Sequence, residues 1–406
     1  MLEAGYEWAP EEATTWKQLW RTRRLDNSPL NQSGVWRYRE ALPFLQDTTD
    51  VITLREGNTP LLGAPRAAEY AGLDSLTFKH QGFNPTGSFK DNGMTCGVSQ
   101  AVRLGKKRVA CVSTGNTSAS MAAYASAAGL QPIIFLPHGN ISFGKLSQAL
   151  EYGALTLQVE ANFDQILALV RTIAEAADIY LLNSVNPFRI EGQKTIAIEM
   201  LDQLDWNVPD WVVMPGGNLG NSSALGKGFL ELKDLGLIDR VPRIGVVQAT
   251  GSAPFYDFMR LPNGSAFKPV TSPETLATAI RIGDPVSWQK AFSVIKRTDG
   301  VVESATEQEI ADAKAVIGRA GIGCEPASAA TLAGIRKLVA KGVISSSASV
   351  VAVLTGNLLK DPDYVYRYHT NELKTPAGEL VKSHFANQPK LVSSNASELI
   401  DFLNHV

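Results

Sequence analysis

Short apolar segments alternate with helix-forming segments along most of this 406-residue chain, and this alternation constrains its fold more than any other feature. Each apolar segment has the length of a buried strand, and the stretches between them are rich in good helix formers. Strands separated by helices pair in parallel and are covered on both faces. We predict strands at 108–112, 131–136, 180–185, 211–214, 243–249 and 349–354. The predicted fold class is therefore α/β, with mostly parallel sheets flanked by helices.

The net charge of −2 and the 44% of hydrophobic residues describe an ordinary globular chain. It lacks the basic excess that nucleic acid or an anionic membrane selects, so small molecules are the expected partners. No apolar run approaches the roughly 20 residues that span a bilayer, and the acidic start resembles neither a secretion signal nor a transit peptide. The three cysteines are odd in number and lack metal-ligand spacing. We expect a cytoplasmic protein without disulfides or a bound metal.

The two ends of the chain differ from its middle. The first 55 residues hold four of the seven tryptophans, at positions 8, 16, 20 and 36. These rings fit an arm packed across a domain or subunit surface, and they fit ordinary core use equally well. The polar stretch after about residue 365 is expected to form a cover or a subunit contact.

Three predicted strands are followed directly by loops that combine glycine, asparagine and hydroxyl residues. The loops are STGNTSAS at 113–120, PGGNLGN at 215–221 and TGN at 355–357. Ligands of open α/β sheets bind beyond the carboxyl ends of the strands, so the site is expected at these loops. One such loop is commonly an ordinary connection, but three at corresponding positions favour a shared ligand site.

The loop at 215–221 suits a phosphate, because glycines let successive backbone N–H groups converge at a helix start, where the helix dipole adds positive potential. Its glycines, at 216, 217 and 220, do not fit the dinucleotide pattern G-x-G-x-x-G, and no Walker lysine follows. The spacing is compatible with a phosphate site and with an ordinary turn.

The segment NPTGSFKDNG at 84–93 places Lys90 at a probable helix start. Ser88 and Asp91 have the spacing of a capping pair, which would put Lys90 in the first helical turn. The helix dipole and burial against Phe89 would both favour its uncharged amine, which can attack a carbonyl group. The alternative is an exposed lysine on a capped helix. An aldehyde-reactive lysine together with a phosphate site indicates pyridoxal 5′-phosphate as the cofactor.

Seven segments together closely resemble the threonine synthases, which belong to the fold type II (tryptophan synthase β-like) pyridoxal-phosphate enzymes with the serine and threonine dehydratases and the cysteine synthases. The segments are HQGFNPTGSFKD, STGNTSAS, NSVNPFRIEGQKT, PGGNLGN, ATAIRIGDPVSW, GIGCEPASAATLAG and LTGNLLKDP. GSFKD alone would indicate only the wider family, whereas NPT, RIEGQKT and ATAIRIG with PVSW are typical of the threonine synthases. The similarity extends from about residue 34 to residue 362.

The resemblance implies two open, twisted sheets, a homodimer, and a cofactor in the cleft between two domains. The implied division is an N-terminal arm at 1–55, a large cofactor-binding domain at 56–92 and 191–365, a small α/β domain at 93–190 and a C-terminal covering segment at 366–406.

The resemblance also implies a role for each matching residue. Lys90 would be the catalytic Schiff-base lysine that carries protons. Asn116 would bind the phenolic oxygen of the cofactor, and the hydroxyl of Thr355 would face its pyridine nitrogen. The cofactor phosphate would be bound by Gly216, Gly217, Asn218, Leu219 and Gly220. The substrate carboxylate would be bound by Ser113, Thr114 and Thr117.

Ser184 and Arg189 distinguish the threonine synthases from the dehydratases, which need no second anion site. By the resemblance they would bind the phosphate of O-phosphohomoserine, a task that suits the planar fork of an arginine. The alternative for Arg189 is a salt bridge between domains. Asn218 and Lys145 are hypothesised to lie near the same anion pocket.

The implied reaction converts O-phospho-L-homoserine and water to L-threonine and phosphate by γ-elimination and β-addition. Three alternatives use the same scaffold: a cysteate-synthase-like β-replacement on phosphoserine, a threonine or serine dehydratase, and a non-catalytic binding protein. One departure from the pattern is Asn357, which stands where many relatives carry histidine.

Overall fold

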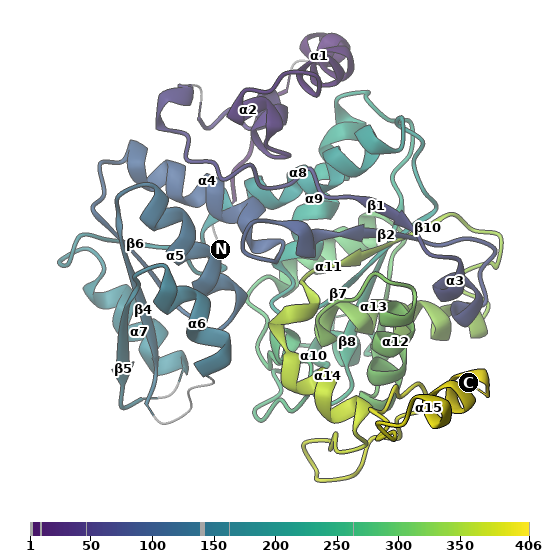
Figure 1. The fold of residues 1–406 in the computed structure, drawn as a ribbon. Helices are drawn as coiled ribbons and strands as arrows, with labels where there is room; N and C mark the ends of the chain where they lie inside the picture. Colours follow the sequence, from purple (N-terminus) through teal and green to yellow (C-terminus); the bar gives the residue numbers. More distant parts are fainter. Residues whose placement is uncertain are drawn as a thin grey trace.

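The computed structural model describes residues 3–8, 10–45, 47–138, 143–161, 163–262 and 264–405. Its core consists of two sheets, each covered by helices, and the N-terminal helices lie at one end of the molecule (Figure 1). All six predicted strands are present, so the predicted α/β fold class is confirmed. In the described part of the chain no helix is both long and apolar enough to cross a bilayer.

Within the described residues, the smaller sheet has the order β5-β4-β3-β6, and all of its strands are parallel. Its side chains alternate between two apolar clusters: Ile134 packs toward α5, and Ile133 packs toward α7 on the opposite face. The strands are β3 (Arg108–Val112), β4 (Gln131–Pro137), β5 (Leu155–Val159) and β6 (Ile179–Leu181). The helices are α4 (Lys90–Arg103), α5 (Asn116–Ala127), α6 (Phe143–Glu151) and α7 (Phe163–Ile173).

In the same described residues, the larger sheet has the order β1-β2-β10-β7-β8-β9, and only β1 is antiparallel to its neighbour. One face packs on α3, α12 and α13, and the other on α8, α9 and α11. The strands are β1 (Leu61–Gly63), β2 (Thr77–His80), β7 (Trp211–Pro215), β8 (Arg243–Ala249), β9 (Val301–Ala305) and β10 (Val350–Leu354). The helices are α3 (Pro65–Ala71), α8 (Pro187–Gln203), α9 (Gly220–Asp234), α10 (Pro254–Met259), α11 (Trp288–Arg297), α12 (Glu307–Arg319), α13 (Pro326–Ala340) and α14 (Pro362–His369).

Four strands were not predicted: β1, β2, β5 and β9. Two of them carry a charged residue into the core, which hides the apolar pattern of a buried strand. Lys79 of β2 is fully buried, pairs with Glu199 of α8 and donates to the Thr59 carbonyl at 2.7 Å. Charged residues occupy such positions only when they are paired, and the sequence does not show the pairing.

The N-terminal arm packs against the helices of the larger sheet. It contains α1 (Trp16–Arg23) and α2 (Pro29–Gln32), drawn in purple at the top of Figure 1. Trp20 is fully buried, with ring centroids 5.2 Å from Tyr38 and 5.9 Å from Trp206. The Trp36 Nε1 donates to Thr95 Oγ1 of α4 at 2.7 Å. The tryptophans therefore serve as core residues that attach the arm to the body.

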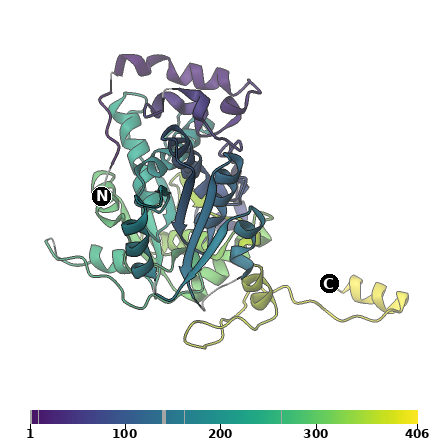
Figure 2. The ribbon, with the colours of Figure 1, turned by 90° about the vertical axis from the view of Figure 1, so that its left-hand side faces the viewer.

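The C-terminal segment covers α12 and then leaves the body. Tyr364, Tyr368, Leu373 and Val381 form an apolar cluster with two alanines of α12. The exposed helix α15 (Ala396–Asn404) projects away from the rest of the molecule (Figure 2). The strands of the smaller sheet lie within 108–181 and those of the larger sheet within 61–80 and 211–354. The domain boundaries given above stay predictions.

Candidate active site

Residues 84–90, which we call the lysine loop, are attached to the carboxyl end of β10, at the centre of the larger sheet. The Phe89 N–H donates to the Thr355 carbonyl at 3.0 Å, and the Asn357 N–H donates to the Gly87 carbonyl at 2.9 Å. Ser88 and Gly356 form an isolated β-bridge between these two bonds. The neighbouring strand β7 runs parallel to β10 and ends at the same edge of the sheet. Residues 215–221, which we call the glycine loop, follow β7 and therefore lie on the same side of the sheet.

Lys90 lies in the first turn of α4, as predicted; it is the first residue of this helix and is partly buried. Burial lowers the pKa of its amine from the ordinary lysine value to about 7; the positive Arg189 acts in the same direction, and Glu325 opposes both. The Nζ atom lies 4.3 Å from the centroid of the Phe89 ring. A large fraction of this amine is therefore neutral near pH 7, as a nucleophile for a carbonyl group requires.

The predicted capping pair of Ser88 and Asp91 is wrong. The residue that precedes the helix is Phe89, and it forms no side-chain cap. Asp91 instead accepts from the Thr86 N–H at 2.7 Å, from the Thr86 hydroxyl at 2.6 Å and from Ser120 Oγ at 2.5 Å. The carboxylate thus ties the lysine loop to α5, and Ser88 Oγ is left buried with no hydrogen-bond partner among the described residues.

Glu325 connects residues from three segments, and sequence reasoning gave it no role. Its carboxylate accepts from Asn116 Nδ2 at 2.9 Å and from the Thr355 hydroxyl at 3.0 Å. It lies just before α13 and is 2% exposed, and burial raises its pKa. Ser328 Oγ lies 2.9 Å from the Thr355 hydroxyl and accepts from the Thr355 N–H. A lone glutamate between cysteine and proline in GIGCEPAS was the only sequence signal for this position.

Gly356 leaves the space that Glu325 occupies. A Cβ at this glycine would lie 2.3 Å from the Glu325 Cδ atom, which no real contact allows. We expect Gly356→Ala to lower the free energy of unfolding by about 1–3 kcal/mol, a typical cost of overpacking, and to displace the carboxylate from Asn116. Urea denaturation measures the first effect. The matched control is Gly63→Ala, where an added Cβ meets nothing within 4 Å; equal stability losses in both variants would contradict the prediction.

The glycine loop between β7 and α9 has the geometry of an anion site. Leu219 adopts a left-handed conformation with φ of 62°, and α9 begins at Gly220. A Cβ at Gly216 would lie 2.5 Å from Val246 Cγ1, so this turn needs glycine. The helix start presents backbone N–H groups that have no partner within the helix.

Asn221, in the first turn of α9, was missed by the sequence interpretation, although PGGNLGN contains it. Its side chain is 7% exposed, and both its oxygen and its nitrogen are buried with no hydrogen-bond partner in the described structure. An amide that is buried without partners is costly unless a ligand satisfies it. Asn218, by contrast, is engaged: its Oδ1 accepts from the Val286 N–H at 3.4 Å, and its carbonyl accepts from the Ser287 N–H at 3.2 Å.

Arg189 lies in the first turn of α8 and is 2% exposed. One guanidinium nitrogen, Nη1, donates to the Leu182 carbonyl at 2.8 Å, whereas Nε has no partner within the described residues. Burial lowers the pKa of Arg189 to about 10. No carboxylate of the described residues forms an ion pair with it, so the structure gives no support to the salt-bridge alternative. Arg189 is close enough to Lys90 to influence its pKa.

The remaining predicted site residues have fewer contacts. Ser113 and Thr114 follow β3 and Thr117 lies in the first turn of α5, and all three are partly exposed. Ser184 is partly exposed in the turn after β6. No interaction among the described residues joins these four side chains to Lys90. The side chain of Lys145 lies outside the described residues.

Asn357 has a structural role. Its Nδ2 donates to the Gly82 carbonyl at 3.1 Å, and its Oδ1 accepts from the Leu359 N–H at 3.0 Å, which caps the short 3₁₀ helix Leu358–Lys360. This asparagine therefore holds the segment after β10 against the lysine loop.

The comparisons with known proteins agree with one another. A family model described as "Pyridoxal-phosphate dependent enzyme" matches residues 52–356. The chain is 50% identical over 333 residues to the threonine synthase of Methanosarcina acetivorans, covering 82% of this chain and 81% of that protein. It is 47% identical over 342 residues to the threonine synthase of Methanocaldococcus jannaschii, covering 84% of each.

Solved structures share the fold at low sequence identity. Maize serine racemase superposes with a TM-score of 0.65 at 20% identity, over 79% of this chain and 93% of that one. A threonine deaminase from Solanum lycopersicum gives a TM-score of 0.65 at 18% identity, over 78% of this chain and 88% of that one. These similarities bear on the architecture alone.

Proposed function

The chain belongs to the threonine synthase family of pyridoxal-phosphate-dependent lyases, and from this premise we propose how its own residues bind the cofactor and convert O-phosphohomoserine and water to threonine and phosphate. The observation that carries the proposal is the position of Lys90. Its amine, with a pKa lowered to about 7, lies at the strand edge where Asn116 and Thr355 meet at Glu325.

The residues present fit pyridoxal phosphate. Lys90 would bond the aldehyde, Asn116 would contact the phenolic oxygen, and Thr355 would face the ring nitrogen. The phosphate would be bound at the start of α9 by Gly216, Gly217, Asn218, Leu219 and Gly220. The unpartnered side chain of Asn221 supports this placement, because a buried amide beside a helix start suits a phosphate oxygen. When bound, the cofactor supplies a conjugated ring that delocalises the negative charge formed at the α-carbon of the substrate.

Glu325 orients the two side chains that would hold the cofactor ring. Asn116 Nδ2 and the Thr355 hydroxyl each donate to one of its oxygens, so both side chains are fixed before any ligand arrives. The carboxyl group is nearly inaccessible to water, which strengthens both bonds. Glu325 is therefore a positioning residue in this proposal.

Lys90 Nζ would move the protons of the reaction. Once the substrate amine has taken its place on the aldehyde, the freed, neutral amine of Lys90 would take the proton from the substrate α-carbon, and as an ammonium it would return a proton where the γ-carbon becomes a methyl group. Arg189 would hold the phosphate of the substrate with its unpaired Nε edge. Ser184 would complete that site, and Ser113, Thr114 and Thr117 would hold the substrate carboxylate.

The pKa of Lys90 predicts how cofactor loading depends on pH. Only the neutral amine reacts with an aldehyde, and the pKa is about 7. The loading rate of the cofactor-free protein should therefore rise about tenfold per pH unit below that value and level off above it.

Glu325 should influence this pH profile. The negative Glu325 raises the pKa of Lys90, so Glu325→Gln should move the midpoint of the loading profile to lower pH. Absorbance at several pH values measures the rate. The exposed Glu398→Gln is the matched control, and identical midpoints in the wild type and Glu325→Gln would contradict the assignment.

Product analysis tests the proposed reaction. The cofactor-loaded protein with O-phosphohomoserine should yield threonine and phosphate in equal amounts, measured by chromatography and phosphate assay. Parallel reactions contain phosphoserine with sulfite, threonine alone, or serine alone. Cysteate as the main product would favour the β-replacement alternative, and ammonia with an oxoacid would favour a dehydratase.

We also propose a homodimer in a reducing, cytosolic compartment. The family resemblance supports the dimer. Cys96, Cys111 and Cys324 are free and buried, which suits a reducing environment. Light scattering of the purified holoenzyme should give twice the mass of the chain; the mass of a single chain would refute the dimer.

A further inference from the structure

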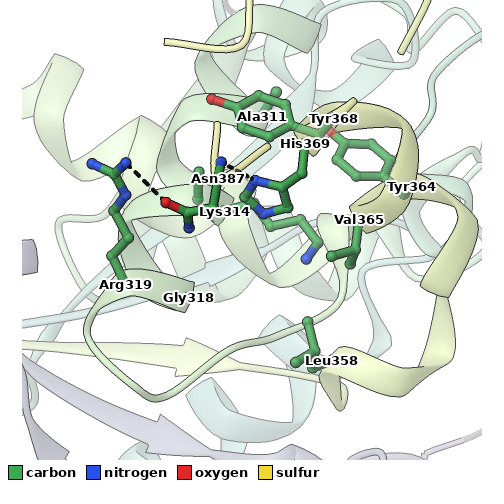
Figure 3. Close-up of a pocket in the computed structure, with 11 residues that line it drawn as sticks. Ala311, Lys314, Gly318, Arg319, Leu358, Tyr364, Val365, Tyr368, His369 and Asn387 are labelled. Carbon is green, nitrogen blue, oxygen red and sulfur yellow. Dashed lines mark hydrogen bonds between the residues drawn. The ribbon is translucent and has the colours of Figure 1, made fainter. Parts of the chain in front are cut away.

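A cavity of about 190 Å³ lies between α12 and α14, outside the residues proposed to bind the cofactor and the substrate (Figure 3). α12 contributes positions 311, 314, 315, 318 and 319, and α14 contributes positions 364, 365, 368 and 369. Leu358 and Asn387 close the remaining sides. Most of the wall is alanine, valine, leucine and tyrosine ring, so the cavity is predominantly apolar, and its size suits a molecule of a single ring or a short branched chain.

Lys314 gives this apolar cavity a positive charge. The residue is 7% exposed, and Figure 3 shows its side chain passing beneath His369 toward Val365. Its Nζ lies 5.9 Å from the centroid of the Tyr364 ring, and among the residues that the structure describes no hydrogen bond or ion pair involves this atom. Burial lowers its pKa, while Asp361 and Cys324 favour its charged form. An ammonium in such a largely buried, apolar wall is costly unless an anion pairs with it closely, and an anion in the cavity would do so.

His369 supplies a second donor to the same space. The Asn387 N–H donates to its Nδ1 at 2.9 Å. Burial, Lys314 and Arg319 lower its pKa, which favours the neutral ring, and because Nδ1 accepts this bond the neutral ring carries its proton on Nε2. Figure 3 shows the ring facing the cavity beside Lys314. The nearby Asp312 is already engaged, because it accepts from the Tyr368 hydroxyl at 3.1 Å and bonds His384 at 3.0 Å.

We propose that this cavity binds a small organic anion: a carboxylate carried on a compact apolar body. The carboxylate oxygens meet Lys314 Nζ and His369 Nε2–H, and the apolar body packs against Ala311, Ala315 and Leu358. A bare inorganic anion would leave the apolar walls unfilled, and a neutral apolar molecule would leave the ammonium unpaired.

The cavity adjoins the segment that carries Glu325. Leu358 packs against Gly323, where an added Cβ would be 3.1 Å from Leu358 Cδ2. Lys314 interacts electrostatically with Cys324, the residue before Glu325. A ligand here would therefore contact the wall of the proposed active site from outside, although its binding does not depend on that proposed function.

The test is calorimetric titration of the holoenzyme with benzoate and with its neutral analogue benzyl alcohol. We expect one benzoate per chain and affinity for benzyl alcohol at least about tenfold weaker, because the lost bond is charge-assisted. Lys314→Met removes the ammonium while keeping an unbranched side chain, and it should weaken benzoate at least about tenfold. Lys233→Met, on an exposed surface, is the control and should leave binding unchanged.

Four outcomes would overturn the proposal. They are no saturable benzoate binding, equal binding of benzoate and benzyl alcohol, undiminished binding in Lys314→Met, and displacement of benzoate by equimolar inorganic phosphate. The last would indicate a simple anion site. A melting temperature of Lys314→Met at or above that of the wild type, expected because a buried charge is removed, shows that the variant is folded.

Discussion

Replacing Lys90 by alanine is expected to lower kcat by at least about 10⁴-fold, the largest effect of any single change in this chain. The variant loses the neutral amine whose pKa lies near 7, and with it the group that would bond the cofactor aldehyde and move the α-proton. The bound cofactor should also lose the absorbance of the lysine adduct and become removable by dialysis. Single-turnover kinetics and the absorption spectrum measure these effects.

Two controls separate this loss from a folding defect. Lys90→Ala removes an amine whose charge is penalised by burial, so the melting temperature of the cofactor-free variant should not fall below that of the cofactor-free wild type. Lys233→Ala, an exposed lysine of α9, should retain full activity. An activity of Lys90→Ala within tenfold of the wild type would refute the role of this residue in catalysis.

Replacing Arg189 by glutamine is expected to lower kcat/KM for O-phosphohomoserine by about 10²- to 10³-fold. The reason is the loss of one or two charge-assisted hydrogen bonds to the substrate phosphate, each contributing about 1.5–3 kcal/mol. The loss should appear mainly in KM, and inhibition by inorganic phosphate should weaken in parallel. Steady-state kinetics with and without added phosphate measure both effects.

A structural role for Arg189 would give a different pattern. Its Nη1 holds the Leu182 carbonyl, so a variant that only loosens this turn would lose stability without losing phosphate inhibition. Arg171→Gln, in the last turn of α7, is the matched control and should leave kcat/KM unchanged. Arg189 also lowers the pKa of Lys90, so the loading midpoint of Arg189→Gln should move to higher pH. An unchanged KM for O-phosphohomoserine would contradict the substrate-binding role.

The sequence was sufficient for features that depend on neighbouring residues. The apolar runs predicted six strands, and Lys90 lies in the first turn of α4 as predicted, although the capping pair from which that position was inferred does not form. The glycine loop could be predicted because the converging N–H groups and the helix start arise within a few residues of one another. Strand β2 was missed because its core position is filled by Lys79, whose charge is compensated by Glu199, 120 residues away in the chain.

Only the tertiary structure decided which side chains meet at the site. Glu325 accepts from Asn116, 209 positions away, and from Thr355, 30 positions away, and no local pattern marks such a contact. Likewise, the Asp91 carboxylate accepts hydrogen bonds from Thr86 and Ser120 and does not form the predicted capping pair with Ser88. The sequence by itself determined six of the strands, the position of the glycine loop and the place of Lys90, because these follow from local geometry. The folded structure decided the pKa of Lys90, the partners of Glu325 and the apolar surroundings of Lys314, because desolvation and charge depend on what packs around a group in space.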